Sequence, residues 1–432
     1  MLAATKTLAI KGGPKAFDVD IGEFSLHPIM EREEIAAVVE LMARGEISVS
    51  PLVRQFEQEF ADYHGMSYAL AQNNGTSTLH AAYFAVGVGP GDEVITPAYT
   101  WHLAVEPIMA AHGIPIFADV DPQSLCLIPE DVERKVTDRT KAICVLHAFG
   151  HPAPMDEIMA IARRYNLAVI EDCSHAHGAT YKGRKIGTIG DIGCFSLQGS
   201  KIIVAGEGGI LVTNNKDYYA RAILLGHYER IPELGDPKYT KYSYNYPQPP
   251  VCFGFKYRPH PLAIAIAREQ FKKLDHFMAI ERENMRYLTD KLTGLHPAFR
   301  PAYEAPDVER VWLNYICSFD EAAAGVSRDR FVEALRAEGV DATAGRAGYL
   351  PNYWNPMYEE KDLWGKGCPW SCPFYGKEIS YPKQGLCPNT EVIWKQTVGL
   401  PVFWNRTPTA VLDKLVAAVA KVLGRLEDLK EA

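Results

Sequence analysis

Basic residues are in the minority in this chain, where 45 Lys and Arg stand against 53 Asp and Glu and the formal net charge is −8. This balance gives no electrostatic attraction toward nucleic acids or anionic membranes. No apolar run approaches the ~18 residues that a membrane span needs. The short apolar stretch 8–10 lies between Lys6 and Lys11, which is unlike a signal peptide. We therefore expect a cytoplasmic protein with no nucleic-acid partner and no membrane partner.

Two common ligand-binding signatures are also absent. Residues 87–92 read G-V-G-P-G-D, but they follow an expected helix and precede a strand, whereas a dinucleotide turn needs the opposite order. A nicotinamide oxidoreductase is therefore a distant alternative. The nine cysteines are scattered, and Cys368, Cys372 and Cys387 lack a fourth ligand at zinc-binding spacing. A thiol-lined loop without metal is the preferred interpretation, and a zinc site is the alternative.

The chain has the composition and length of a globular protein with two domains. Hydrophobic residues make up 47% and charged residues 23% of its 432 residues. That length exceeds the usual size of one hydrophobic core. Strand-like and helix-like segments alternate up to about residue 225, which favours a mostly parallel sheet. We predict a large α/β domain over residues 1–275 and a smaller α+β domain over residues 276–432.

Chemically active residues are concentrated near the middle of the chain. The apolar run 168–170 predicts a buried strand that leads to Asp172, at the strand end where open α/β sheets bind ligands. A second predicted strand ends at Ser196, and Lys201 precedes the glycine-rich turn 206–209. Taken singly, such residues are usually surface charges or turn formers. Together they suit pyridoxal phosphate, which needs a lysine amine, an acid against its ring nitrogen and hydroxyl or N–H groups for its phosphate.

The same stretch resembles the active-site segment of the DegT/DnrJ/EryC1/StrS family, the sugar and cyclitol aminotransferases of fold type I. The matching motifs are E-D-C-S-H-A-H-G-A, G-D-I-G-C-F-S and K-x-x-x-x-G-E-G-G. The resemblance implies that Lys201 holds pyridoxal phosphate as an internal aldimine and that Asp172 contacts the ring nitrogen. It also implies that Ser196 binds the phosphate and that His175 replaces a residue, often Gln, that bonds the ring oxygen.

Three other segments supply further cofactor residues. The turn before the helix at Thr76 and Ser77 suits a phosphate, although a plain helix cap has the same chemistry. The family places the cofactor phosphate there. Trp101 follows a strand end and could stack on the pyridine ring, with a buried packing role as the alternative. Lys256 occupies the place where relatives have an Asn that reaches the partner subunit's cofactor phosphate, and a surface charge is its alternative role.

The resemblance implies a fold type I α/β structure with a mostly parallel mixed sheet in its large domain, a smaller C-terminal α+β domain and a homodimer. It also implies ping-pong transamination, in which glutamate or glutamine donates the amino group to a keto-cyclitol or keto-sugar acceptor and Lys201 moves the proton. One branch of the family carries histidine instead of this lysine and contains dehydratases, so Lys201 favours an aminotransferase. A dehydratase or lyase, and a non-catalytic regulatory protein that binds the cofactor, stay open.

Several aromatic segments are weaker candidates. The tyrosine-rich stretch 226–255 is expected to form a substrate-edge or dimer-contact loop. Tyr349 and Tyr353 are candidates for positions near the substrate, because relatives have a tyrosine- or histidine-bearing turn in this region. His147 either lies beneath the cofactor ring or is a hydrogen-bonded interior histidine. The K-x-R-x-H-P form of residues 256–261 leans toward the cyclitol branch of the family.

Overall fold

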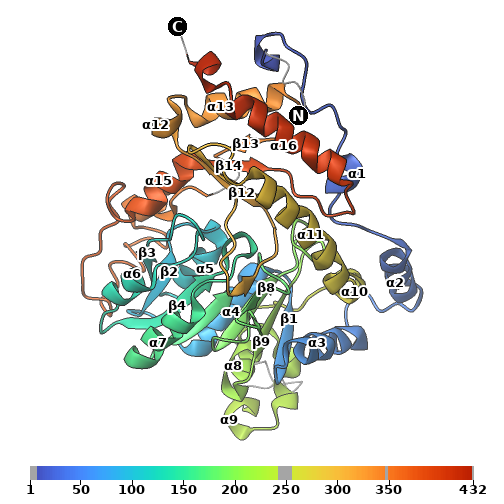
Figure 1. Cartoon of the computed structure of the whole chain (residues 1–432). Helices are drawn as coiled ribbons and strands as arrows, with labels where there is room; N and C mark the ends of the chain where they lie inside the picture. Colours follow the sequence, from blue (N-terminus) through green and yellow to red (C-terminus); the bar gives the residue numbers. More distant parts are fainter. Residues whose placement is uncertain (1–6, 242–254, 346–348, 431–432) are drawn as a thin grey trace.

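The computed structural model describes residues 7–241, 255–345 and 349–430. Its central element is a seven-stranded sheet with the order β1-β9-β8-β5-β4-β2-β3 (Figure 1). Strand β9 runs antiparallel to β8 and β1, and the other neighbours pair in parallel. This confirms the predicted mostly parallel mixed sheet. The strands are β1 (Tyr68–Gln72), β2 (Glu93–Pro97), β3 (Ile114–Ala118), β4 (Thr140–Leu146), β5 (Ala168–Asp172), β8 (Ile192–Ser196) and β9 (Gly209–Thr213).

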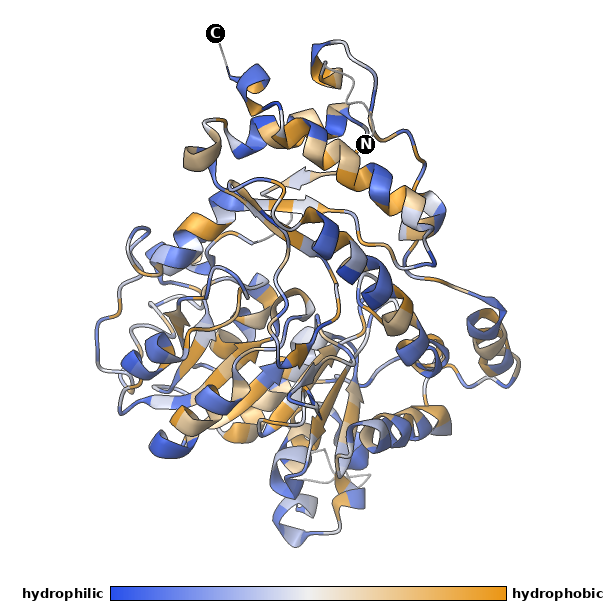
Figure 2. Cartoon of the chain, viewed as in Figure 1, coloured by the Kyte–Doolittle hydropathy of each residue, from blue (hydrophilic) through white to orange (hydrophobic). Residues whose placement is uncertain are grey.

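Helices cover both faces of this sheet, because parallel neighbours must be joined by crossover connections. The helices that share a buried cluster on one face are α4 (Gly75–Val86), α5 (Glu106–Ala110) and α8 (Lys216–Gly226). Those on the other face are α3 (Pro51–His64), α6 (Pro129–Arg134), α7 (Met155–Tyr165) and α10 (Pro261–Lys272). The strands of this sheet are mostly hydrophobic in Figure 2, and their side chains belong to the buried clusters of both faces, as this three-layer arrangement requires.

The C-terminal part of the chain builds a second, antiparallel sheet with the order β10-β12-β14-β13. Its strands are β10 (Phe299–Arg300), β12 (Tyr315–Phe319), β13 (Thr343–Ala344) and β14 (Thr397–Leu400), and the helices beside it are α11 (Leu274–Leu292), α13 (Arg328–Ala337) and α16 (Thr409–Leu423). Helix α16 buries Leu412, Leu415 and Val419 at helical spacing. Leu8 and Phe17 pack in the same cluster, so the N-terminal segment lies against the C-terminal part. The division at residue 275 stays a prediction.

The remaining elements are short or peripheral. They are α1 (Gly22–Ser25), α2 (Arg32–Ala43), α9 (Pro237–Thr240), α12 (Glu321–Ala324), α14 (Pro356–Glu360), α15 (Pro388–Gln396), β6 (Thr180–Tyr181), β7 (Arg184–Lys185) and β11 (Val308–Glu309). Most of the tyrosines of the predicted loop 226–255 lie outside the described residues. Among the described residues, no helix combines the length and apolarity that crossing a bilayer would demand.

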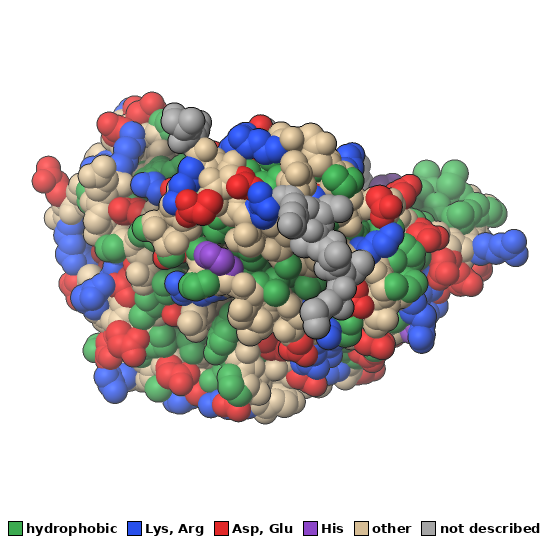
Figure 3. All heavy atoms as spheres, turned by 45° about the horizontal axis from the view of Figure 1, so that its top comes forward, with side chains coloured by type: hydrophobic (Ala, Val, Ile, Leu, Met, Phe, Trp, Pro, Cys, Tyr) green, Lys and Arg blue, Asp and Glu red, His purple; other side chains and the backbone are tan. Residues whose placement is uncertain are grey.

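Helix α2 stands at the edge of the molecule and exposes an apolar stripe. Ile35, Val39 and Met42 lie on one side of it and are 62%, 57% and 58% exposed. The hydrophobic group at the right-hand edge of Figure 3 lies over this helix. Apolar side chains at this spacing normally face a core, as they do in α16. Helix α2 therefore presents a face that nothing in the described chain covers.

The segment that contains the predicted cysteine-rich loop packs on the first sheet and not on the second. Tyr358, Trp370, Tyr381 and Cys387 belong to the buried cluster that includes β2 and β3. Cys368 and Cys372 are half-exposed, and all three cysteines are free thiols. The chain therefore returns from the C-terminal region to the edge of the large sheet before it completes the second sheet.

Candidate active site

A cavity of about 500 Å³ lies where β5 and β8 end, beside the first turn of α4. Parallel strands bring their carboxyl ends to one edge of a sheet, which is where ligands bind in such folds. The predicted site residues that line this cavity are Thr76, Trp101, Asp172, His175, Ser196 and Lys201. A larger hollow of about 670 Å³ lies against α11 and contains none of them. The chemistry therefore identifies the smaller cavity as the candidate site.

Lys201 and Asp172 place opposite charges in the same enclosed space. Lys201 follows β8, and burial lowers the pKa of its amine against the opposing charge of Asp172. Asp172 ends β5 and is 3% exposed, and burial raises the pKa of its carboxyl. The Ser174 hydroxyl opposes this shift, as do the Ser174 N–H, which donates to Asp172 Oδ1 at 3.0 Å, and the charge of Lys201. Both groups are therefore held closer to neutrality than in water.

The carboxylate of the neighbouring Glu171 lies in a different environment. Its carboxylate accepts hydrogen bonds from the N–H groups of Gly187, Ile189 and Gly190 at 2.8, 2.7 and 2.6 Å. His147 Nε2 lies 3.1 Å away. Burial would raise the pKa of Glu171, but His147 and these N–H groups outweigh it and hold the pKa below its usual value. His147 is thus a hydrogen-bonded interior histidine, the second of its two predicted roles.

His175 is fixed by hydrogen bonds on both ring nitrogens. The backbone N–H of Phe149 donates to Nδ1 at 3.4 Å, and the Tyr349 hydroxyl lies 3.2 Å from Nε2. Burial lowers the pKa of His175 well below its usual value, and the charge of Lys201 adds to the effect. The imidazole is therefore neutral at physiological pH. Tyr349 also lines the cavity, whereas Tyr353 is buried elsewhere and donates to Glu391 at 2.7 Å.

The first turn of α4 forms an anion cradle at one end of the cavity. Asn74 caps the helix, and the Ser77 N–H donates to its Oδ1 at 2.7 Å. Gly75 approaches so closely that a Cβ there would lie 2.6 Å from Ser196 Cβ. The first N–H groups of a helix have no intrahelical acceptor and carry the positive end of the dipole. With the Thr76 and Ser196 hydroxyls, this turn suits a phosphate.

Ser77 and Lys256 are the two predicted cofactor residues that do not line this cavity. The Ser77 hydroxyl donates to the Asn74 carbonyl at 2.7 Å and serves the helix cap. Lys256 is exposed on the surface. Trp101 lines the cavity with half of its surface exposed, so its packing alternative does not describe it. Leu313 and Asn314 line the cavity from the C-terminal part, and no sequence motif marked them.

Comparison with known proteins places this geometry in context. The DegT/DnrJ/EryC1/StrS aminotransferase family matches residues 28–419. An uncharacterized protein from Methanocaldococcus jannaschii is 31% identical over 399 residues, which are 92% of this chain and 96% of that protein. The structure of an aminotransferase from Psychrobacter cryohalolentis has a TM-score of 0.79 at 26% identity, covering 94% of this chain and 100% of that one.

Two further solved structures have a similar fold. The structure of 3-amino-5-hydroxybenzoic acid synthase has a TM-score of 0.78 at 26% identity and covers 93% of this chain and 99% of that one. A GDP-4-keto-6-deoxy-D-mannose-3-dehydratase from E. coli with bound hydrated pyridoxal phosphate has a TM-score of 0.76. Its identity is 23%, with 91% of this chain and 98% of that one covered, so it shares the fold alone.

The residues of the cavity fit pyridoxal phosphate, the cofactor that membership of this family implies. The cradle at α4 supplies donors for a phosphate. Asp172 is a buried carboxylate bonded by Ser174, and a cation at the ring nitrogen would offset the cost of burying its charge. Lys201 is a half-buried amine whose pKa is lowered by burial, which favours nucleophilic attack on a carbonyl carbon. Each chemical requirement of the cofactor has a matching group.

Proposed function

The chain belongs to the DegT/DnrJ/EryC1/StrS aminotransferase family, and from that premise we propose that it is an aminotransferase. Glutamate or glutamine supplies the amino group, and the acceptor is a keto-cyclitol or keto-sugar. The observation that carries the proposal is the meeting of Lys201 and Asp172 in one cavity. Relatives with histidine at the lysine position are dehydratases, and this chain has lysine.

Each side chain of the cavity has a definite task in this proposal. Bound pyridoxal phosphate supplies a carbonyl carbon that receives the amino group and a ring that delocalises an electron pair. Lys201 Nζ accepts a proton from the substrate carbon and returns it, and its lowered pKa suits this exchange. The Asp172 carboxylate holds a proton on the ring nitrogen. Trp101 covers the ring, and Thr76 and Ser196 hold the phosphate.

The lining of the cavity supports a neutral, hydroxyl-rich acceptor. Among the described residues that line it, Lys201 is the one cationic side chain, since His175 is neutral. Hydroxyl and amide groups are supplied by Thr100, Gln198 and Asn314. Nucleotide-linked sugars carry two phosphates, which arginine or lysine normally binds. A cyclitol or a related carbocycle therefore suits this cavity better, and the named product of the synthase with a similar fold is itself carbocyclic.

We propose further that the enzyme is a homodimer. Lys256 is exposed and lies outside its own cavity, as expected if it reaches the partner's cofactor phosphate. The exposed stripe of Ile35, Val39 and Met42 offers an apolar face to a second copy. The cytoplasm is the proposed location, because the eight described cysteines are all free thiols, as in reducing compartments.

Absorbance spectroscopy tests the assignment of Lys201. The purified protein, loaded with pyridoxal phosphate, is expected to be yellow, and glutamate or glutamine should bleach it. Lys201→Ala should abolish both the colour and the turnover. Lys185→Ala is the matched control, because Lys185 is another half-buried lysine whose pKa burial lowers. An unchanged spectrum with full turnover in Lys201→Ala would show the proposal to be wrong.

Product analysis separates the remaining alternatives. An aminated cyclitol or sugar in the presence of a donor supports transamination. A deoxygenated keto product without a new amino group identifies a dehydratase. A protein that holds the cofactor through Lys201 but is bleached by no amino donor is a non-catalytic, cofactor-binding protein. These outcomes share the same scaffold, so the product decides among them.

A further inference from the structure

Arg310 is a buried arginine that forms no direct ion pair within the described part of the chain. It follows β11 in the C-terminal part of the chain and is 4% exposed. Among the described residues, no carboxylate lies within ion-pair distance of its guanidinium. Burial lowers its pKa to about 10 against the opposing charges of Glu304 and Glu281, so it still carries a charge at physiological pH. Burying a charge without a direct ion pair is costly, and such a residue is expected to serve a particular purpose.

The guanidinium donates to three backbone carbonyls: one in the turn at Phe149, one at Tyr303 and one at the next residue, Val311. Nη2 donates to the Phe149 carbonyl at 3.0 Å, Nη1 donates to that of Tyr303, and Nε donates to that of Val311 at 3.4 Å. The central carbon of the guanidinium, Cζ, lies over the Trp312 ring, 3.7 Å from the ring centroid. Only a planar fork of N–H donors satisfies three carbonyls in this way, so lysine could not replace it fully.

Phe149 connects this arginine to the active site. Its carbonyl accepts from Arg310, while its own N–H donates to His175 Nδ1 at 3.4 Å. Its backbone has a positive φ of 48°, a conformation that needs support in a residue with a side chain. The Phe149 ring also stacks on the His175 ring, with 5.6 Å between centroids and 17° between planes. Arg310 thus holds the residue that holds His175.

Val311, the residue after Arg310, also contacts the turn that contains Phe149. The Val311 N–H donates to the Gly150 carbonyl at 3.2 Å, and a Cβ on Gly150 would lie 2.0 Å from the Val311 carbonyl oxygen. Two residues further on, Leu313 and Asn314 line the cavity itself. Residues 310–314 therefore join the C-terminal part of the chain to the turn beside the active site.

These contacts determine the tautomer of His175. A backbone N–H can only donate, so Nδ1 is the acceptor and the neutral ring carries its proton on Nε2. Nε2 then donates to the Tyr349 oxygen 3.2 Å away, which leaves the phenol hydrogen free to donate to another group in the cavity. Tyr349 also stacks on Phe149, with 5.3 Å between centroids.

We propose that Arg310 is a positioning residue, which fixes the tautomer of His175 and the hydroxyl direction of Tyr349 through the Phe149 peptide. This inference rests on the proposed function for the consequence in catalysis, but the tautomer itself does not depend on that function. Through Arg310, the C-terminal part of the chain would determine which atoms donate and which accept hydrogen bonds at the cofactor site. A packing role alone would affect stability and leave the tautomer unchanged.

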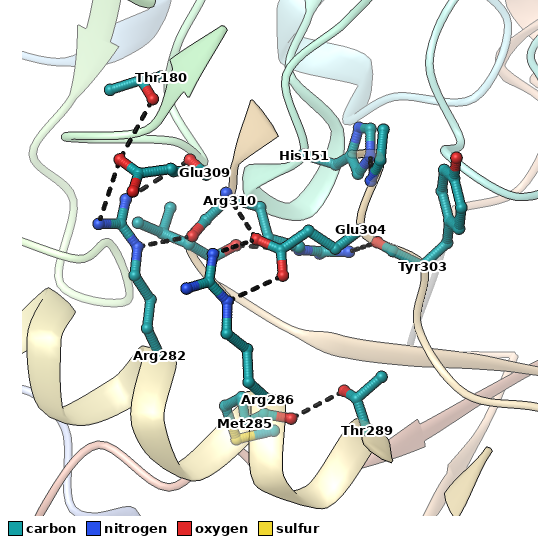
Figure 4. A network of polar contacts seen from close by, with 12 residues as sticks. His151, Thr180, Arg282, Met285, Arg286, Thr289, Tyr303, Glu304, Glu309 and Arg310 are labelled. Carbon is teal, nitrogen blue, oxygen red and sulfur yellow. Dashed lines mark hydrogen bonds and ion pairs between the residues drawn. The ribbon is translucent and has the colours of Figure 1, made fainter. Parts of the chain in front are cut away.

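Arg286 provides the matched control. Figure 4 shows it beside Arg310 in the same network, where its guanidinium faces Glu304. Its two nitrogens lie 3.0 and 2.8 Å from the Glu304 carboxylate, and it makes no contact with the turn at Phe149. Arg286→Met therefore removes one arginine from this network but leaves the proposed connection intact.

The decisive measurement is histidine ¹⁵N NMR on the full-length, cofactor-loaded protein labelled at histidine, with the His175 signal assigned from His175→Gln. We expect the Nε2–H form in the wild type and in Arg286→Met, and a mixture of tautomers in Arg310→Met. In parallel, kcat/KM should fall about tenfold or more in Arg310→Met and change less than about twofold in Arg286→Met. A wild-type tautomer and unchanged kcat/KM in Arg310→Met would overturn the proposal.

Two further outcomes are separable. If Arg310→Met does not fold, Arg310→Lys keeps the charge and the apolar stem but loses the fork, and an intermediate tautomer ratio is expected. A wild-type ratio in Arg310→Lys would then contradict the proposal. If the wild type transaminates no acceptor, the proposed function fails, yet the tautomer comparison still decides the role of Arg310.

Discussion

Glu171 and Asp172 are adjacent on β5, but their carboxylates lie in two regions with opposite physical character. Successive side chains of a strand point to opposite faces, so one turns toward the loop 187–190 and the other toward the cavity. Glu171 accepts from three N–H groups and lies beside His147, and its pKa is lowered. Asp172 accepts from the N–H and the hydroxyl of one residue, Ser174, and burial raises its pKa.

The two residues show how a buried charge that stabilises the fold differs from one that is available to a ligand. A buried carboxylate surrounded by donors stabilises the native state in its ionised form. One left under-bonded beside a cavity is destabilised until a ligand cation reaches it, which is typical of active sites. Substitutions that remove each charge should therefore have opposite effects on stability and on catalysis.

The largest expected effect is the loss of activity in Asp172→Asn. The amide cannot hold a proton on the ring nitrogen, so kcat/KM should fall on the order of 10³-fold. The unfolding free energy of the cofactor-free protein should be equal or higher, because a raised pKa marks an ionised carboxylate that is disfavoured in the folded state. Steady-state kinetics and urea denaturation of the same preparation check both parts.

A loss of stability comparable to that of a core mutation would contradict this division. It would mean that the Asp172 carboxylate supports the fold, as Glu171 does. Asp191→Asn is a suitable control, because burial also raises the pKa of that carboxyl and Asp191 does not line the cavity. It should leave turnover nearly unchanged.

Glu171→Gln should show the reverse pattern. An amide –NH₂ placed among three N–H donors cannot reproduce the carboxylate's contacts, so the unfolding free energy should fall by about 2–4 kcal/mol at neutral pH. The lowered pKa of Glu171 means that its stabilisation is present above the ordinary glutamate pKa and is lost as pH falls through the folded value. The difference in unfolding free energy between the variant and the wild type should therefore become smaller at acidic pH.

Denaturation curves measured from neutral to acidic pH test this behaviour. A gap that stays constant with pH would show that Glu171 acts through packing and not through its charge. Turnover at a temperature where the variant is folded should stay within about tenfold of the wild type, since Glu171 does not line the cavity.

Glu281 is a third buried carboxylate, which neither accepts several hydrogen bonds, as Glu171 does, nor lines the cavity, as Asp172 does. It lies on α11, and neither carboxylate oxygen has a hydrogen bond of good geometry among the described residues. Burial raises its pKa from 4.5 to about 8, against weaker opposing effects of the Trp312 N–H and of the charges of Arg310 and Arg282. A raised pKa stabilises the fold below the unfolded value, and this contribution is lost as pH rises through the folded value.

Glu281→Gln should therefore be more stable than the wild type, with a gain that grows between about pH 4.5 and 8. The limiting gain is on the order of a few kcal/mol. Glu283→Gln, two residues along the same helix on its exposed side, should show no such trend. A thermal-denaturation series across this pH range would contradict the assignment if both variants behaved alike.

The sequence was enough to bring most of the predicted cofactor residues to one cavity, because they sit at strand and helix ends. Asp172, Ser196 and Thr76 belong to elements whose ends meet at one sheet edge, so local patterns were enough to bring them together. Leu313 and Asn314 reach the cavity through long-range packing, which leaves no local signal, whereas Tyr349, a candidate from the family resemblance, also lines it. Tyr353, a candidate from the same region as Tyr349, packs away from the cavity.

The organisation of the domains shows the same limit. Leu8 and Phe17 pack with the C-terminal sheet, and Trp370 packs with the first sheet, against the order of the chain. Hydrophobic periodicity predicts that such residues are buried but not against what. The stripe on α2 is the converse case, where the pattern of a buried helix is found on an exposed one.

The smallest expected effect comes from Thr76 and Ser77, which repeat on α4 the contrast seen on β5. Thr76 lines the cavity, whereas the Ser77 hydroxyl donates to the Asn74 carbonyl at 2.7 Å. Thr76→Val should weaken cofactor binding about 3- to 10-fold with little change in stability. Ser77→Ala should lower the unfolding free energy by about 1 kcal/mol and leave cofactor affinity within about twofold, since its N–H stays bonded to Asn74.

Fluorescence titration of cofactor-free protein, paired with urea denaturation, measures both the cofactor affinity and the unfolding free energy. If Ser77→Ala weakened binding as much as Thr76→Val, the Ser77 side chain would belong to the phosphate site, and adjacent residues at this helix start would share one role.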